Sequence, residues 1–152
     1  MTCPLCDQAA LARAGRHDRF IAELSETFML LSDRQGCRGW TVLVLKEHAE
    51  HLADLPAQRQ ARVFADVVRS AAAIRSVFAT SGTGGGPSRI NYECLGNQVA
   101  HVHWHLIPRH RDDPDPSNAI WGWSEDRLSG TITGDEQREL IEAIAVALAD
   151  VA

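Results

Sequence analysis

Three histidines at alternate positions, His101, His103 and His105, are the residues of this sequence best suited to chemistry. Two residues is the repeat of a β-strand, so the imidazoles would share one face at intervals of about 7 Å, with apolar residues 102, 104 and 106 buried on the other. An imidazole exchanges protons near neutral pH, attacks as a nucleophile or binds a metal. The pattern predicts a catalytic or ligand-binding face; the alternative is a solvent-exposed strand that happens to be rich in histidine.

A second chemical pattern lies at the N-terminus, where Cys3 and Cys6 form a C-x-x-C pair. Such a pair is a redox couple, half of a zinc site or a chance spacing. The redox interpretation needs a thioredoxin-like order of elements, which this sequence does not predict. The zinc interpretation needs two more ligands elsewhere in the chain.

Length and charge limit the class of protein. The 152 residues suit a single domain spanning 1–152. A formal net charge of −5 argues against binding to a nucleic acid polymer, which requires a basic surface, but not against a small phosphorylated ligand. No apolar run reaches the roughly 18 residues that cross a membrane, and the first residues lack a signal-peptide pattern. We therefore expect a cytoplasmic protein with reduced cysteines and no membrane partner.

The elements that must position these residues follow from periodicity and turn signals, which predict a mixed α+β order. The predicted strands are 20–24, 27–31, 40–46, 89–94 and 100–107, and the predicted helices are 7–15, 56–78 and 134–151. The first two strands form a hairpin, and Gly96-Asn97 is predicted as a tight turn between the last two. Residues 81–87 are expected to be a flexible loop and residues 110–130 to be irregular.

Several motifs together resemble the histidine triad (HIT) superfamily. The triad itself, the segment 89–97 before it and Pro108-Arg109 after it resemble the bacterial diadenosine-tetraphosphate-hydrolase-like branch. Residues 42–48 are similar to the family's strand that ends in Lys-x-His, and with the C-x-x-C pair the resemblance covers roughly residues 3–109. It implies an α+β HIT-like meander: a five-stranded antiparallel sheet with a long central helix and a C-terminal helix, usually as a homodimer.

The resemblance also implies a reaction, hydrolysis or transfer at the α-phosphate of a nucleotide. His103 would attack phosphorus and form a covalent nucleotidyl-histidine, which water then hydrolyses. His105 and the backbone amides of residues 96–98 would bind the phosphate oxygens that gain charge in the transition state. His101 completes the triad. Relatives carry a supporting histidine where this chain has Trp40, so we expect the triad to lose one polar partner here.

Further positions match the family's substrate contacts. Asn91 would contact the sugar-phosphate, Asp33 would accept from the ribose hydroxyls, and Gly96 would let the backbone of Asn97 approach a phosphate. Alternatively, Asn91 is an ordinary surface strand residue, Asp33 an ordinary turn aspartate and Gly96 a plain hairpin glycine. Gln98 stands where many relatives carry Ser or Thr, which leaves the handling of the leaving group open.

The resemblance completes the metal site as well. In C-x-x-C members of the superfamily, zinc is bound by the positions that here are Cys3, Cys6, His48 and His101. Two thiolates and two imidazoles make a closed tetrahedral set of the structural kind. His51 is a competing ligand, which we rank second.

Two tryptophans lie outside these patterns. Trp121 and Trp123 follow a Pro- and Asp-rich loop and would either stack on a base or anchor the loop, and we favour the anchor. Arg109 and His110 would reach a distal phosphate or lie at a solvated strand end. We expect a HIT-type hydrolase of dinucleoside polyphosphates or nucleoside phosphoramidates. The alternatives are a nucleotidyl transferase or phosphorylase, a non-catalytic nucleotide-binding module and a zinc-dependent hydrolase.

Overall fold

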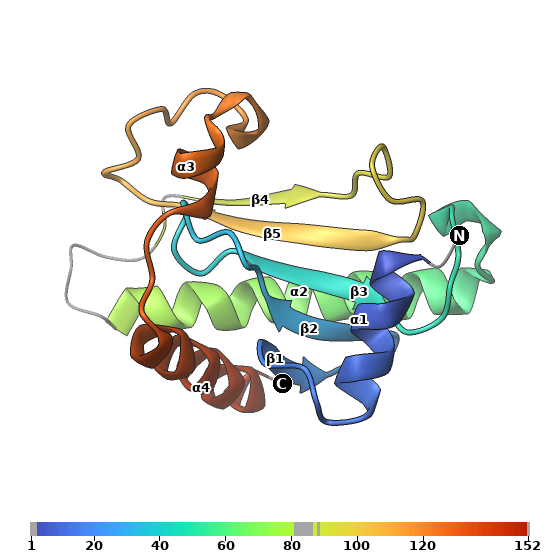
Figure 1. Ribbon diagram of the computed structural model, residues 1–152. Helices are drawn as coiled ribbons and strands as arrows, with labels where there is room; N and C mark the ends of the chain where they lie inside the picture. The colour runs from blue at the N-terminus through green and yellow to red at the C-terminus, as the bar shows by residue number, and fades with distance from the viewer. Residues whose placement is uncertain (1–2, 81–86, 88, 152) are drawn as a thin grey trace.

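A five-stranded antiparallel sheet forms the centre of the fold, with strand order β1-β2-β3-β5-β4 (Figure 1). The computed structural model describes residues 3–80, 87 and 89–151. The strands are β1 (Phe20–Glu23), β2 (Thr27–Leu31), β3 (Thr41–Leu45), β4 (Arg89–Glu93) and β5 (His103–Arg109). Every neighbouring pair is antiparallel, so the predicted α+β class and the five-stranded sheet are confirmed.

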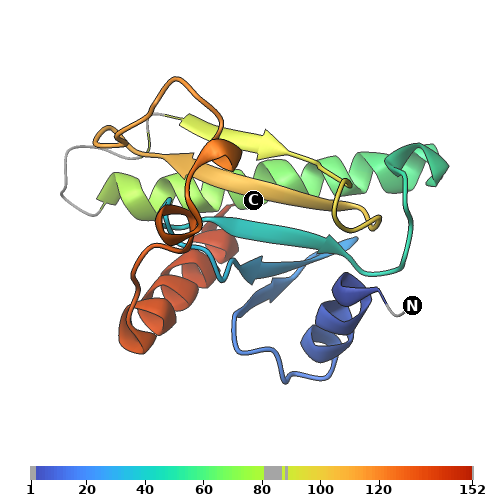
Figure 2. The same cartoon turned by 45° about the horizontal axis from the view of Figure 1, so that its top comes forward.

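Helices cover both faces of the sheet (Figures 1 and 2). The long helix α2 (Ala57–Thr80) and the C-terminal helix α4 (Gly134–Asp150) pack on one face. Helix α1 (Pro4–Arg13) covers part of the other face, and the short helix α3 (Glu125–Ser129) lies beyond the end of β5. Two 3₁₀ turns, η1 (Leu52–Asp54) and η2 (Ile120–Gly122), complete the order. Among the described residues, no helix is long and apolar enough to cross a membrane.

Strand β2 shows why the chain folds in layers. All five of its residues are buried, because alternate side chains enter two different cores. Phe28 and Leu30 pack with the alanines of α1, whereas Met29 and Leu31 pack with residues of α2 and α4. A strand that is covered on both faces reads as a continuous apolar run in the sequence, as this one does.

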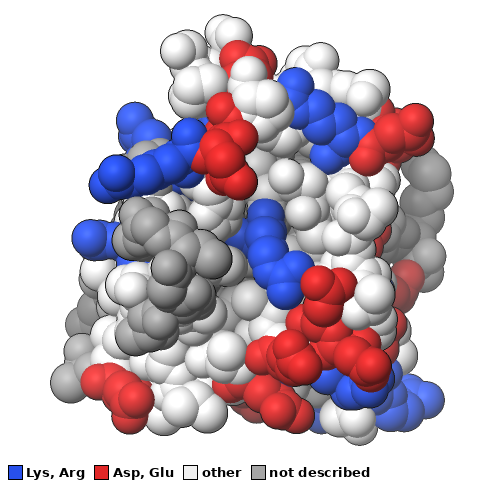
Figure 3. Space-filling view, turned by 90° about the vertical axis from the view of Figure 1, so that its left-hand side faces the viewer, with Lys and Arg blue, Asp and Glu red and all other residues white. Residues whose placement is uncertain are grey.

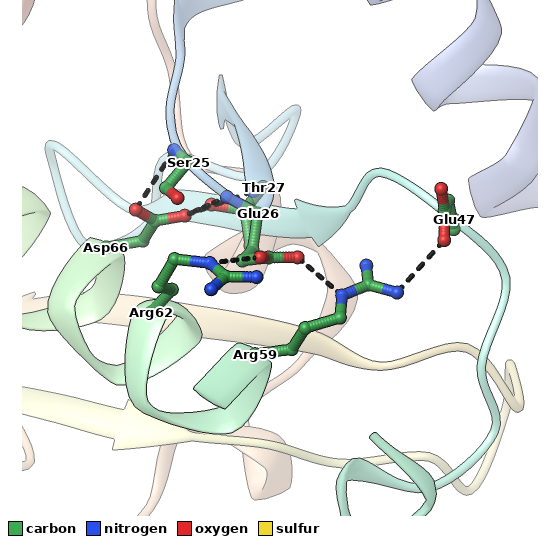
Figure 4. Close-up of polar contacts among 7 residues, drawn as sticks. All are labelled: Ser25, Glu26, Thr27, Glu47, Arg59, Arg62 and Asp66. Carbon is green, nitrogen blue, oxygen red and sulfur yellow. Dashed lines mark hydrogen bonds and ion pairs between the residues drawn. The ribbon is translucent and has the colours of Figure 1, made fainter. Parts of the chain in front are cut away.

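A buried carboxylate fixes the turn between β1 and β2 (Figure 4). Asp66 of α2 accepts the backbone N–H groups of three consecutive residues, 25–27, the last of which begins β2. Glu26 in the turn pairs with Arg59 at 2.8 Å and Arg62 at 2.6 Å. Burial acts to raise the pKa of Glu26, but these two guanidinium groups lower it below its ordinary value. The hairpin is therefore bound to α2 by charge-assisted hydrogen bonds as well as by apolar packing.

Two predictions about the histidine hairpin are wrong. Strand β4 ends at Glu93 and β5 begins at His103, so residues 94–102 form a long connector in place of a tight Gly96-Asn97 turn. His101 lies before the strand, since its N–H donates to the carbonyl of Val99 and the chain bends there. Only His103 and His105 share a strand face. The segment 110–130, predicted as irregular, contains η2 and α3, and 81–86 of the predicted loop lie outside the described residues.

Charge is mixed on the surface at the left-hand side of Figure 1. Figure 3 shows basic and acidic side chains interspersed over the part of that face that the structure describes. A mixed face of this kind does not provide the continuous basic surface that a nucleic acid polymer requires.

Candidate functional site

His103 and His105 project into a pocket of about 690 Å³ on the sheet face that carries α1. Their strand partners on that face are Val44 and Val42 of β3, which also line the pocket. The walls come from α1 at one end, from η2 and α3 at the other, and from the connectors before β3 and β5. A pocket of this size accommodates a nucleotide-sized ligand.

The environment of His103 determines which of its nitrogens is free. Nδ1 lies 2.6 Å from the backbone carbonyl oxygen of His101, and a carbonyl only accepts, so Nδ1 carries the proton and donates. In the neutral ring, Nε2 then holds the lone pair. The side chain is buried but lines the pocket, which suits a nucleophile with limited access to water.

His105 is held in the opposite tautomer. The Trp40 indole N–H donates to its Nδ1 at 3.1 Å, so the neutral ring carries its proton on Nε2. Burial lowers the pKa of His105 to about 4, with smaller contributions from His103 and Arg34. At neutral pH this ring is therefore an uncharged hydrogen-bond donor. The expectation that Trp40 removes a polar partner from the triad is wrong, because the indole N–H provides that contact.

Trp121 and Trp123 have different surroundings. Trp121 lines the pocket and meets the rings of His105 and Trp40 edge-on, with centroids 5.1 and 5.6 Å away. Its indole N–H donates to Glu93, which lies opposite His105 in the sheet. Trp123 also lines the pocket, and Arg127 lies 3.5 Å over its ring. The anchoring interpretation fits Trp123, whereas Trp121 forms the pocket wall beside the triad.

The interpretation of Arg109 as a phosphate ligand or a solvated strand end is wrong. Its side chain is buried, bonds Asp113 at 2.6 Å and donates to the carbonyls of Asp115 and Asn118. These contacts fix the loop that leads to Trp121. His110, the adjacent candidate, contacts the carbonyl of Arg38 at 2.9 Å. Sequence reasoning missed this structural role because the acceptors are mostly backbone groups, which no motif marks.

The predicted substrate residues divide into two sets. Asp33, Asn97 and Gln98 line the pocket. Gly96 is absent from the lining, and no left-handed backbone conformation requires glycine there. Asn91 is also outside the lining, and its amide donates to Glu93 at 3.4 Å.

Cys3, Cys6, His48 and His101 converge on one point, with their ligand atoms all within 4.8 Å of one another. The Nδ1 atom of His101 lies 3.4 Å from the Sγ atom of Cys3 and 3.5 Å from that of Cys6. The Nδ1 atom of His48 lies 3.5 Å from Cys6 Sγ and 3.4 Å from His101 Nδ1. A tetrahedron with bonds of about 2.3 Å to sulfur and about 2.0 Å to nitrogen has edges of about 3.3–3.5 Å between two nitrogens or a sulfur and a nitrogen, and of about 3.8 Å between the two sulfurs. The donor atoms therefore fit a zinc ion.

The partners of the cluster support the same conclusion. His101 donates from Nε2 to the carbonyl of Leu45 at 2.9 Å, which leaves Nδ1 as the free nitrogen that faces the cysteines. Burial and the adjacent Cys3 sulfur raise the pKa of the Cys6 thiol, a cost that a bound cation would remove. His51, ranked second as a ligand, precedes η1 and is exposed, and the group of converging side chains does not include it.

Comparison with known proteins identifies related folds. The HIT domain family matches residues 14–112. Among solved structures, a histidine triad protein from Sinorhizobium meliloti has 23% identity and a TM-score of 0.69, with 88% of each chain covered. A zinc-bound HIT family protein from Mycobacterium smegmatis has 24% identity and a TM-score of 0.66, covering 95% of this chain and 94% of that one.

A third structure is a hypothetical histidine triad nucleotide-binding protein from Sulfolobus tokodaii, with 15% identity and a TM-score of 0.70 over 95% of this chain and 93% of that one. No curated protein matches the chain. Below 25% identity, these structural likenesses show the fold alone.

Proposed function

Because the chain belongs to the HIT domain family, we propose that it is a nucleotide hydrolase that forms a covalent nucleotidyl-His103. Its substrates would be dinucleoside polyphosphates or nucleoside phosphoramidates, cleaved at the α-phosphate as in the diadenosine-tetraphosphate-hydrolase-like branch. One observation carries the proposal: the hydrogen bond from His103 Nδ1 to the His101 carbonyl. It leaves the Nε2 lone pair available on a ring that lines the pocket.

The reaction consists of two displacements at phosphorus. In the first, the Nε2 lone pair of His103 forms a P–N bond while the bond to the leaving group breaks, and the leaving group departs with that electron pair. In the second, a water oxygen forms a P–O bond, the P–N bond breaks, its electron pair returns to Nε2, and the water gives up a proton. The proton from the water passes to solvent. An amine leaving group takes up a proton from solvent as it departs, whereas a polyphosphate leaves as an anion.

His105 would stabilise the charge that develops on the phosphoryl oxygens. Its Nε2–H is a fixed donor in a buried site, where such a hydrogen bond is stronger than in water. Backbone amides of residues 96–98 would provide further donors, and the Gln98 side-chain amide would serve where relatives carry a hydroxyl. Asp33 would accept from the ribose hydroxyls, and Asn91 would contact the sugar-phosphate from the edge of the site.

We expect Trp40→Phe to lower kcat/KM by about tenfold, the value of one ordinary hydrogen bond. The phenyl ring keeps the apolar contact but removes the donor that fixes His105 as the Nε2–H tautomer. Nitrogen-15 NMR of the histidine rings would show His105 in a mixture of tautomers. Trp104→Phe is the matched control, since the Trp104 indole nitrogen is buried with no hydrogen-bond partner among the described residues. Equal tautomer populations in wild type and Trp40→Phe would contradict the assigned role.

We propose that the cluster of two cysteines and two histidines binds structural zinc. The ion would supply a crosslink between the N-terminal cysteines, His48 after β3 and His101 before β5. With four protein ligands it leaves no open position for water, which argues against the zinc-dependent hydrolase. A site with two thiolates also fits a reducing compartment such as the cytoplasm.

A homodimer is the assembly that we propose. Strand β4 stands at the edge of the sheet and is available for pairing with a second copy. Tyr92 on that strand is 50% exposed, and Phe64 and Val68 are exposed on α2. An edge strand beside exposed apolar side chains is typical of an interface between protein chains.

A panel of adenosine and guanosine polyphosphates and phosphoramidates, with the products resolved by mass, tests the proposed function. We expect a mononucleotide from at least one substrate class and, after rapid quenching, a protein mass increased by one nucleotidyl group. Tight binding without turnover would instead indicate a non-catalytic nucleotide-binding module. Transfer to added phosphate, sulfate or a sugar phosphate in preference to water would indicate a phosphorylase or transferase.

A further inference from the structure

Four charged side chains line the pocket: Arg19, Asp33, Arg34 and Glu125. Arg34 lines the same pocket as His103 and His105 and forms an ion pair there with Glu125. It belongs to the connector between β2 and β3, directly after Asp33. A guanidinium at this place is suited to an anionic group that extends from a phosphate bound at the triad.

Arg34 forms an ion pair with Glu125. Its Nη2 lies 3.0 and 3.1 Å from the two carboxylate oxygens of Glu125, in the first turn of α3. The side chains are 34% and 65% exposed, and an ion pair so open to water contributes only about 0–1 kcal/mol. A phosphate that carries more charge than a carboxylate and is held in the pocket at its other end can displace Glu125.

The segments that carry the pair are joined by their backbones. Gln35 N–H donates to the Ser129 carbonyl at 2.8 Å, and Gly36 N–H donates to the Leu128 carbonyl at 2.9 Å. A Cβ at Gly36 would lie 2.0 Å from the Arg127 carbonyl oxygen, so the two backbones approach as closely as they can. The pair can therefore open by rotation of side chains alone, without movement of the connector or of α3.

We propose that Arg34 binds the phosphates beyond the α-phosphate and that Glu125 competes with them for its guanidinium. The chain would then select dinucleoside polyphosphates over phosphoramidates, whose amine leaving group offers no anion to Arg34. This inference rests on the proposed function, because it places the α-phosphate at His103. Glu125 increases the preference for polyphosphates, since a ligand must carry enough negative charge to displace Glu125 from Arg34.

The test compares kcat/KM for diadenosine tetraphosphate and for an adenosine phosphoramidate of an uncharged amine. We expect Arg34→Gln to lower the ratio of the two values by tenfold or more, with the greater loss on the polyphosphate. Glu125→Gln should raise kcat/KM for the polyphosphate severalfold at low ionic strength. The matched control is Arg38→Gln, because Arg38 pairs with Glu136 at 3.4 Å from the same connector but lies outside the pocket lining.

Two results would overturn the inference: an unchanged ratio in Arg34→Gln, or the same change in Arg38→Gln. If the wild type turns over neither substrate, the proposed function fails, and binding decides the matter separately. Calorimetry with adenosine monophosphate and with a methylene-bridged, non-hydrolysable diadenosine tetraphosphate then compares wild type with Arg34→Gln. A tenfold preference for the longer ligand that Arg34→Gln abolishes supports the role of Arg34, and equal ratios in the two proteins exclude it.

Discussion

Replacing His103 by alanine should lower kcat by about 10⁴-fold or more and abolish the nucleotidyl adduct. The expected loss is this large because every bond change in the proposed reaction passes through His103 Nε2, and losing a covalent nucleophile costs far more than losing one binding contact. The neighbouring imidazole cannot take over the attack. Its Nδ1 accepts from Trp40 and its Nε2 carries the proton, so neutral His105 has no free lone pair.

The same variant separates catalysis from binding. His103→Ala removes a buried ring, so its melting temperature and its affinity for adenosine monophosphate must be measured beside its activity. We expect binding to remain within about tenfold of wild type, because one lost contact is worth about 1.4 kcal/mol or less. His51→Ala, which alters an exposed histidine outside the pocket, is the control. Full turnover by His103→Ala on any substrate of the panel would falsify the nucleophilic role.

The strands could be predicted because their hydrophobic pattern depends only on residues that are close together in the sequence. The continuous apolar run of β2 and the β-branched run of β3 each lie within five consecutive positions. The free nitrogen of His103 was beyond prediction, although its partner, the His101 carbonyl, is only two residues away. Every residue has a backbone oxygen, so the sequence does not show which one accepts a hydrogen bond. The bend that directs the His101 carbonyl toward His103 lies in the connector 94–102, which was predicted as a tight turn.

Contacts between distant segments were harder to predict. Trp40 and His105 are 65 residues apart, and the indole N–H replaces an imidazole only because β3 and β5 pair in one register. Arg34 and Glu125 are 91 residues apart and meet through backbone hydrogen bonds whose close approach requires Gly36, and no motif in the sequence marks that pairing. The metal cluster is the exception, because a resemblance to known ligand positions identified all four residues across 98 positions of sequence.

Loss of a ligand from the metal cluster is the second change from which we expect a large effect. Protein purified without chelator should contain one zinc per chain, and Cys6→Ser and His48→Ala should lose it and melt at a markedly lower temperature. Structural zinc sites bind with apparent free energies of about 10–16 kcal/mol, so losing one removes a large part of the stability of a small protein. The site also bears on the nucleophile, because His101 is both a ligand candidate and the residue whose carbonyl holds His103 Nδ1. We therefore expect kcat to fall together with zinc content, although the ion takes no part in the chemistry.

Matched variants distinguish metal loss from general damage. Cys94→Ser and His51→Ala change the same residue types outside the cluster and should retain zinc and the wild-type melting temperature. Adding zinc to partly depleted wild-type protein should restore stability with the logarithm of the free zinc concentration, as mass action requires for a ligand that binds only the folded chain. Wild-type zinc content in Cys6→Ser, or a wild-type melting temperature after complete depletion, would show that the four side chains converge for another reason.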